Sequence, residues 1–451
     1  MKRMWIALVV MLGMAAPALA VDFTFHGDLN HRFRLYTNQV NFFDGAGNSW
    51  QSMHKKAITE EDNNDLMGEI KYRLWTEMAS DDGAIKGVYA IEVGGIQFGS
   101  GTDGDFSGDG VDVETRWAYT DFALGSGRAK IGLQTFTVNK FIWQETATGI
   151  DYSVPVGNGN VELAWMRGYE RPHDDSDLDH NDFDDLDALY ARYNFSPAEG
   201  TKMGLFALWQ HSDGDTLSDG ATGPNYNYVS RGGFTTLDLD LYTLGFDGTL
   251  AAGNFFANWD LFYQFGDLME EVDFGGYFAH LDVGAKMGKG KLMFTSWYAS
   301  GDDDATDDDY DAFVATDIDI NSEYSVVLFE GYTDDDYFAE APYLMDKGMI
   351  LFRLGYDHQT TDKLKVGLSA AYLMTAEDIE YLDNNGIARS DDEIGVEVDA
   401  YVSYKLFSST EVALQAGYLM TGDAMDYYEV DCDGSADEDI YIINSRLRYS
   451  F

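Results

Sequence analysis

The feature that most constrains the fold of this chain is an alternation of apolar and polar residues with a period of two. Between residues 394 and 406 the apolar set is Ile394, Val396, Val398, Ala400, Val402, Tyr404 and Leu406, interleaved with Gly395, Glu397, Asp399, Tyr401, Ser403 and Lys405. Successive side chains of a strand point to opposite faces, so the pattern predicts strands with one apolar and one polar face. It recurs at residues 23–35, 70–74, 237–241, 257–263, 279–287 and 412–418.

The connections between the predicted strands alternate sharply in length. Eight are short, at residues 80–84, 125–128, 157–160, 196–201, 247–253, 288–290, 358–363 and 408–410, and longer stretches rich in Asp and Gly separate them. If each short turn joins two strands and the terminal strands complete the set, the chain has 18 strands. Residues 301–346 leave a count of 16 to 20 open, because residues 324–332 fit either an additional strand pair or a loop folded into the interior.

The polar faces carry too much charge for a dry core, because buried ions are costly unless they are paired. The acids predicted to face inward are Asp28, Glu69, Asp238, Asp240, Asp260, Asp282, Glu397 and Asp399. A closed barrel satisfies every backbone group in a bilayer, and about 16 to 18 strands leave an aqueous channel. The sequence therefore predicts an all-β, antiparallel transmembrane barrel with a wet, acid-lined pore.

Residues 1–20 have the organisation of a secretory signal. Lys2 and Arg3 precede an apolar run that ends at Ala16, and Ala18-Leu19-Ala20 is a small-residue cleavage pattern. The run is too short for a membrane-spanning helix. We expect cleavage after Ala20 and a single barrel domain over residues 21–451.

The last strand is the sharpest motif in the chain. Its outward face is predicted to carry Tyr441, Ile443, Leu447, Tyr449 and the terminal Phe451, and its inward face Asn444, Arg446, Arg448 and Ser450. With the signal segment, the alternating strands and the short turns, this ending resembles the Gram-negative outer-membrane porins. The resemblance implies that the aromatic face is an assembly signal for the barrel-assembly machinery.

The resemblance also implies a homotrimeric, water-filled diffusion channel in the outer membrane, in contact with lipid and lipopolysaccharide. Short turns then face the periplasm and long loops the exterior. Such porins narrow the pore with a loop folded inward after an early strand. The corresponding residues are 139–149, with Glu145 as their one acid, and residues 301–346 are the alternative.

Six cations are predicted on the inward faces of the first, second and last strands: Arg32, Arg34, Lys71, Arg73, Arg446 and Arg448. Closure makes these strands neighbours. Two interpretations are open. The cluster either forms a basic pore wall that sets a transverse field, or it forms ordinary ion pairs with Asp28, Glu69 and Glu77.

The chain has 79 acidic and 29 basic residues and a net charge of −50, which excludes nucleic acid binding through a basic face. Acids are dense at residues 173–187 and 302–311, as solvated loops or as a vestibule that concentrates cations. Glu429, Asp431, Asp433 and Gly434 match the first half of a calcium loop, but Ile440 stands where the bidentate Glu belongs. We expect loosely bound calcium at most and no other cofactor.

No catalytic motif is present in the sequence, and we expect no enzyme activity. The predicted function is a porin that passes small hydrophilic solutes and favours cations. Three alternatives remain: a substrate-specific channel, a barrel sheath around an electron-transfer protein, and a structural or adhesive surface barrel.

Overall fold

The computed structural model describes residues 21–37, 65–99, 113–169, 186–213, 238–268, 272–304, 307–318, 320–332, 339, 341–429 and 431–451. The predicted signal segment and most of the first acid-rich loop lie outside these residues. No helix in the described part of the chain is long and apolar enough to cross a membrane.

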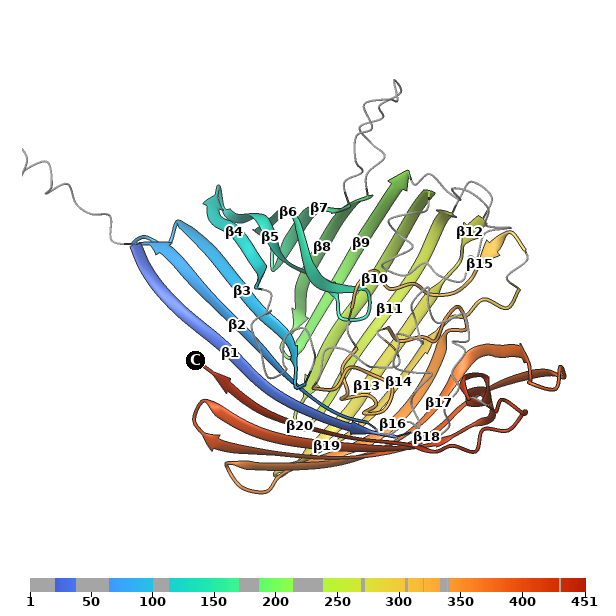
Figure 1. Ribbon diagram of the computed structural model, residues 1–451. Coiled ribbons are helices and arrows are strands. Elements are labelled where there is room, and N and C mark those ends of the chain that lie inside the picture. The colour runs from blue at the N-terminus through green and yellow to red at the C-terminus, as the bar shows by residue number, and fades with distance from the viewer. Residues whose placement is uncertain are drawn as a thin grey trace, which may run out of the picture.

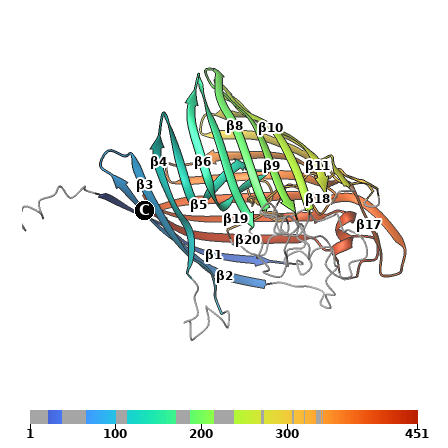
Figure 2. The ribbon, with the colours of Figure 1, turned by 90° about the horizontal axis from the view of Figure 1, so that it is seen from above.

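Eighteen antiparallel strands form one closed barrel (Figures 1 and 2), which confirms the predicted fold class and count. They are β1 (Val21–Tyr36), β2 (Asp65–Ser80), β3 (Ile85–Gln97), β4 (Glu114–Leu124), β5 (Gly127–Asn139), β6 (Trp143–Val156), β7 (Gly159–Tyr169), β8 (Leu186–Ala198), β9 (Thr201–Asp213), β10 (Asp238–Ala252), β11 (Phe255–Leu268), β13 (Tyr277–Met287), β14 (Gly290–Ala299), β16 (Met349–Gln359), β17 (Leu364–Leu382), β18 (Ala388–Phe407), β19 (Thr410–Thr421) and β20 (Ile440–Ser450). Two short strands, β12 (Val272–Phe274) and β15 (Asp309–Tyr310), pair in parallel between barrel strands.

All eight predicted short connections join neighbouring barrel strands. One was placed too early: β10 continues to Ala252, and the chain turns at Gly253, whose φ of +63° suits glycine. Residues 139–149 were expected to be a loop. They are the end of β5, a turn at residues 140–142 and the start of β6.

The barrel closes where β20 pairs with β1, and the C-terminus lies beside β1 (Figures 1 and 2). The backbones of Gly27 and Phe451 exchange two hydrogen bonds of 3.0 Å. The predicted outward face of β20 is confirmed, with exposed fractions between 37% and 51% for Tyr441, Ile443, Leu447, Tyr449 and Phe451. Its role as an assembly signal stays a prediction.

The predicted inward orientation of Asp238 and Asp240 is wrong. Leu239 and Leu241 are the fully buried, inward side chains of β10, and Asp240 accepts a 2.7 Å hydrogen bond from Trp209 Nε1 on the outer face. The prediction assigned every apolar face to lipid. Here apolar residues of the loops pack inside the barrel, so the inward face of β10 is apolar as well.

Deleting Phe451 should lower the yield of folded barrel, because it removes both backbone hydrogen bonds to Gly27 and the last aromatic of the outward face. The heat-modifiable band of the outer-membrane fraction measures this yield. A Phe451→Tyr variant is the control and should fold normally. Full yield from the truncated chain would contradict the prediction.

Candidate pore constriction

Within the segment that joins β14 to β16, the described residues 312–318, 320–332 and 341–348 lie inside the barrel, and we call them the inner segment. Phe313 and Phe329 are at most 1% exposed. Their rings pack against inward side chains of the wall, with centroids 5.0 Å apart for Phe313 and Phe278 and 5.7 Å for Phe329 and Trp297. This resolves the two readings of residues 324–332. They form turns inside the lumen, not an additional strand pair.

Polar side chains of several strands fasten the inner segment to the wall. Gln264 of β11 exchanges two 2.8 Å hydrogen bonds with the backbone of Val314. On β18, the Glu397 carboxylate accepts hydrogen bonds from the backbone N–H groups of Val326 and Val327, at 2.7 and 3.0 Å, and from the Ser325 hydroxyl. The Thr316 hydroxyl also donates a 3.0 Å hydrogen bond to Gln210 of β9, and the Ser322 hydroxyl donates one of 3.0 Å to Gln415 of β19. The anchors thus extend over the strands from β9 to β19, and the inner segment spans the lumen.

The tip of the β5–β6 hairpin also leaves the wall. Pairing of β4 with β5 stops at Leu133 and pairing of β6 with β7 stops at Thr148, whereas β5 and β6 stay paired up to Asn139 and Trp143. The tip therefore bends into the barrel (Figure 1). The carbonyl of Ile142, at this tip, accepts a 2.8 Å hydrogen bond from the inner segment. Both segments that were expected to narrow the pore, the hairpin tip and the inner segment, thus lie inside the barrel.

A cavity of about 170 Å³ lies between the hairpin tip and the inner segment. Its lining residues are Lys140, Gln144, Glu145, Ile320, Asn321, Glu323 and Tyr324. It shares Lys140 with a chamber of about 760 Å³, and it shares Asn321 and Glu323 with a chamber of about 580 Å³. We call this small space the constriction, because it lies between the hairpin tip and the inner segment, which both narrow the lumen.

Lys140 is held in place at the constriction. Its Nζ donates a hydrogen bond to the Tyr324 hydroxyl, and it lies 4.6 Å from the ring centroid of Phe141 and 5.2 Å from that of Tyr324. Contacts of this geometry are cation–π interactions. The constriction therefore carries one fixed cation and two carboxylates, those of Glu145 and Glu323.

The six predicted cations do form one cluster on β20, β1 and β2. Register places Arg32 opposite both Glu69 and Arg446. Each of five cations contacts an acid: Arg32 with Glu69, Lys71 and Arg73 with Glu92, Arg446 with Glu411, and Arg448 with Asp28. Arg34 is buried, and its guanidinium lies 5.6 Å from the Tyr36 ring. The part of these cations in permeation stays a prediction.

The expected pairings with Asp28 and Glu69 are present, whereas Glu77 pairs with Lys86 at 3.3 Å. Glu92 and Glu411 are partners that the sequence reading missed. Glu92 and Glu411 stand at inward positions of the two-residue alternation of β3 and β19, so this alternation could have identified them as partners.

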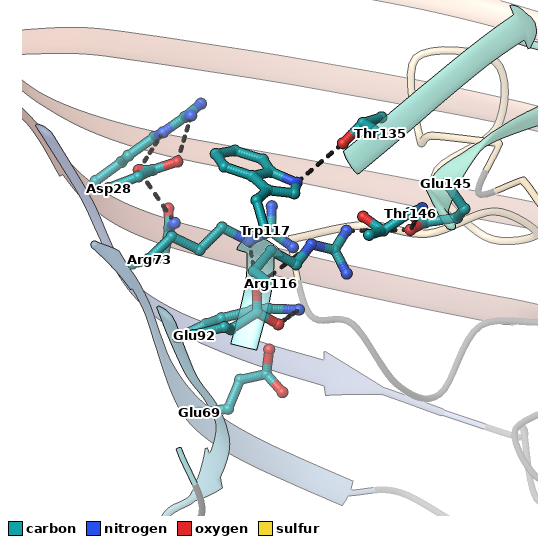
Figure 3. Close-up of polar contacts among 12 residues, drawn as sticks. Asp28, Glu69, Arg73, Glu92, Arg116, Trp117, Thr135, Glu145 and Thr146 are labelled. Carbon is teal, nitrogen blue, oxygen red and sulfur yellow. Dashed lines mark hydrogen bonds and ion pairs between the residues drawn. The ribbon is translucent and has the colours of Figure 1, made fainter. Parts of the chain in front are cut away.

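We call the six cations and their acidic partners the charged wall. Arg116 extends the charged wall, and the sequence analysis did not predict this residue. It lies between Glu92 and Glu145 (Figure 3), 3.9 Å and 3.1 Å away. Ala90 pairs with Trp117 and Ile91 with Thr115, so Arg116 is the extra residue of a β-bulge. A bulge breaks the two-residue alternation on which the prediction depended.

The remaining predicted acids face inward but are covered. Asp260 and Asp282 flank the His280 ring at 2.8 and 3.2 Å, and Asp260 also borders the larger chamber. Glu397 and Asp399 are at most 1% exposed beneath the inner segment. They stabilise packing inside the lumen and do not present free carboxylates to it.

The calcium candidate is not assembled in this structure. Within the described ranges no group of three or more acidic, histidine or cysteine side chains is placed to hold a metal ion. The Glu429 carboxylate instead accepts hydrogen bonds from the backbone N–H groups of Asp437 and Glu438, at 3.4 and 3.1 Å. Calcium binding by these acids stays an untested expectation.

No protein-family model matches the chain, and no curated protein matches it in sequence. Solved structures do match in fold. OprD from Pseudomonas aeruginosa is 9% identical with a TM-score of 0.56, and the match covers 97% of this chain and 95% of that one. OccK3 (OpdO) of the same organism is 11% identical with a TM-score of 0.52, covering 95% of each chain. OpdK, solved with vanillate, is 11% identical with a TM-score of 0.51, covering 95% and 98%.

Identities this low show the fold alone. The chain has the closed 18-stranded barrel of these outer-membrane proteins, with apolar side chains exposed around its outer face. A barrel of this kind is the fold of Gram-negative outer-membrane porins, so its location is the outer membrane.

Replacing Glu397 by Ala should loosen the inner segment, because three hydrogen-bond donors lose their acceptor at a buried site. Such losses cost about 1–3 kcal/mol per unsatisfied group. We expect larger and noisier single-channel conductance. Glu77→Ala is the control, since Glu77 is an inward acid near the end of β2 that pairs with Lys86 of the neighbouring strand. Unchanged conductance in a folded Glu397→Ala barrel would contradict the prediction.

The two ends of the segment that joins β14 to β16 meet where Asp302 contacts Asp346, and we call this contact the neck. The neck should loosen as pH rises. Asp302 N–H donates a 2.7 Å hydrogen bond to the Asp346 carbonyl, and both side chains are 2% exposed. Burial, with the Asp346 carboxylate beside it, raises the pKa of Asp302 from 3.8 to about 6. The folded protein thus binds this proton more tightly, so its stabilising contribution is complete below pH 3.8 and is lost as pH rises through about 6.

Hydrogen exchange of the neck amides, corrected for intrinsic pH dependence, measures this effect. Protection should fall between pH 4 and pH 7 in the wild type. Asp302→Asn should abolish the change, whereas Asn at the exposed neighbour Asp303 should retain it. Equal pH dependence in both variants would show that another group is responsible.

Proposed function

We propose that this outer-membrane barrel is a narrow, size-selective channel for small hydrophilic solutes that prefers cations. The observation that carries the proposal is the constriction, a space of about 170 Å³ between the hairpin tip and the inner segment inside the barrel. Passage through such a space depends on solute size and charge and needs no catalytic group.

The net charge of the chain supports the cation preference. At the constriction itself the charges balance, because Lys140 and the Arg116 partner of Glu145 stand against the carboxylates of Glu145 and Glu323. The chain as a whole carries a net charge of −50, and like-signed charge around a pore raises the local concentration of counter-ions. The cations of the charged wall oppose this preference, although each has a carboxylate or an aromatic ring beside it.

A substrate-specific channel is the second candidate. It is favoured by the ordered pairing along the charged wall, which offers a solute fixed donors and acceptors instead of mobile charge. The solved structure of OpdK with vanillate shows that a barrel of this fold was captured with a small organic molecule. Saturation of transport with rising solute concentration distinguishes this candidate from simple diffusion.

Planar-bilayer conductance and liposome swelling test the proposal. Purified barrel should give discrete channels, and swelling rates should fall steeply as sugars increase in size. Glu397→Ala should shift this cut-off to larger sugars. A folded barrel without conductance would contradict a channel and favour a structural surface barrel. Tight co-purification of a haem protein would favour an electron-transfer sheath.

Removing cations from the charged wall should strengthen cation preference. Arg73, Arg116 and Arg448 are the partly exposed members, so changing all three to Gln leaves the buried pair of Arg32 and Glu69 intact. Lys71 stays 3.0 Å from the buried carboxylate of Glu92, so this acid keeps a partner and the barrel should still fold. The cation-to-anion permeability ratio should rise by about two-fold or more at low salt.

Reversal potentials in a potassium chloride gradient measure this ratio. Arg167→Gln is the control, because Arg167 pairs with Asp187 near the end of β7, away from the charged wall. An unchanged ratio in the folded triple variant would place the charged wall outside the limiting path.

The homotrimer and the dependence on the barrel-assembly machinery also remain proposals, which rest on the resemblance to porins. Light scattering of the detergent-solubilised protein measures the first. Folded yield after depletion of the assembly machinery measures the second.

A further inference from the structure

A row of aromatic side chains lies on the inner face of the barrel, next to the charged wall and on the side of the short turns. Register places His26 of β1 opposite Trp75 of β2, Trp75 opposite Ala90 of β3, and Ala90 opposite Trp117 of β4. Trp75 stands two positions from Arg73 along β2, so both side chains lie on the inward face. We call His26, Trp75 and Trp117 the aromatic row.

The three rings of the aromatic row contact one another. The ring centroids of His26 and Trp75 lie 5.0 Å apart with planes inclined by 20°, and those of Trp75 and Trp117 lie 5.8 Å apart with planes inclined by 75°. Ala90, in register between the two indoles, is 1% exposed, and its small side chain lets them meet. Trp117 Nε1 donates a 3.0 Å hydrogen bond to Thr135 Oγ1 of β5, which fixes the direction of this ring (Figure 3).

The aromatic row differs from the other inward aromatic side chains of the wall. Phe278 and Trp297 are at most 1% exposed, because the inner segment packs against them. The three rings of the aromatic row are only half-buried, and within the described ranges their ring partners are one another. Aromatic faces that border a wet lumen gain free energy when an apolar surface covers them.

Charged side chains flank the aromatic row on both sides. Asp28, Arg73 and Glu92 are two positions away along β1, β2 and β3 on one side. Glu77 and Lys86 lie on the other side, 3.3 Å apart and both partly exposed. The row crosses three strand spacings, about 14 Å in all. This length suits two linked sugar rings, with hydrogen-bonding groups along both edges.

We propose that the aromatic row is a binding site for a neutral sugar, whose pyranose rings stack on the indoles while their hydroxyl groups bond to the flanking charged side chains. The axial C–H groups of a pyranose form an apolar face with partial positive charge, which matches the electron-rich face of an indole. Equatorial hydroxyls project sideways, where carboxylates accept and guanidinium groups donate hydrogen bonds. The inference rests on the proposed channel function, because the sugar reaches the row through the lumen.

Titration calorimetry on the purified barrel tests the site, with maltose as the ring probe and sorbitol as an open-chain probe. The detergent should be an amine oxide, because a glycoside detergent would compete for the site. We expect saturable binding of maltose and none of sorbitol, which has hydroxyl groups but no rigid C–H face. Trp75→Leu and Trp117→Leu keep an apolar side chain without a π face, and each should weaken maltose binding by about three-fold or more.

Trp209→Leu is the matched control. Trp209 lies on the outer face, where it donates to Asp240, so this variant should bind maltose like the wild type. Trp75→Phe and Trp117→Phe retain an aromatic face and should bind maltose with intermediate affinity. These two variants decide the question if the leucine variants do not fold, and unaltered affinity in both would then contradict the site.

Three further results would overturn the inference: no saturable maltose binding to folded wild-type barrel, equal affinity for maltose and sorbitol, or equal affinities in Trp75→Leu, Trp117→Leu and Trp209→Leu. Conductance separates this failure from that of the channel. A barrel that conducts but does not bind maltose contradicts the sugar site alone. A barrel that binds maltose but never conducts contradicts the channel alone.

Discussion

Backbone pairing across the seam between β1 and β20 is the constraint on which the rest of this structure depends. An unpaired backbone group in hydrocarbon costs several kcal/mol, so the sheet must close before it can cross a bilayer. Closure of 18 strands encloses more space than the inward side chains alone can fill. The inner segment and the hairpin tip occupy part of that excess space, and the constriction lies between them.

Much of the barrel could be predicted because a two-residue period survives wherever lipid faces one side of a strand. The closing strand, the turns and the strand count all follow from it. The period fails where the environment changes. Asp240 was misplaced because the inward face of β10 packs on apolar loop residues, and Arg116 was missed because a bulge interrupts β4. The inner segment has no period at all, since its apolar residues meet the wall from turns.

The candidate site was harder to predict than the fold, because it depends on partners far apart in the sequence. The six cations were correctly grouped by closure alone, yet Glu92 and Glu411 as their partners needed the register of β3 and β19.

The inner segment is fastened to Gln210 of β9 and to Gln415 of β19, two strands that lie far apart around the ring. It therefore acts as a crosslink across the barrel. An oval distortion of the barrel would lengthen or shorten the distance between these two anchors and so strain the hydrogen bonds at both. The cross-section should therefore resist lateral pressure from the membrane, and the bore of the pore should be nearly independent of bilayer tension and thickness.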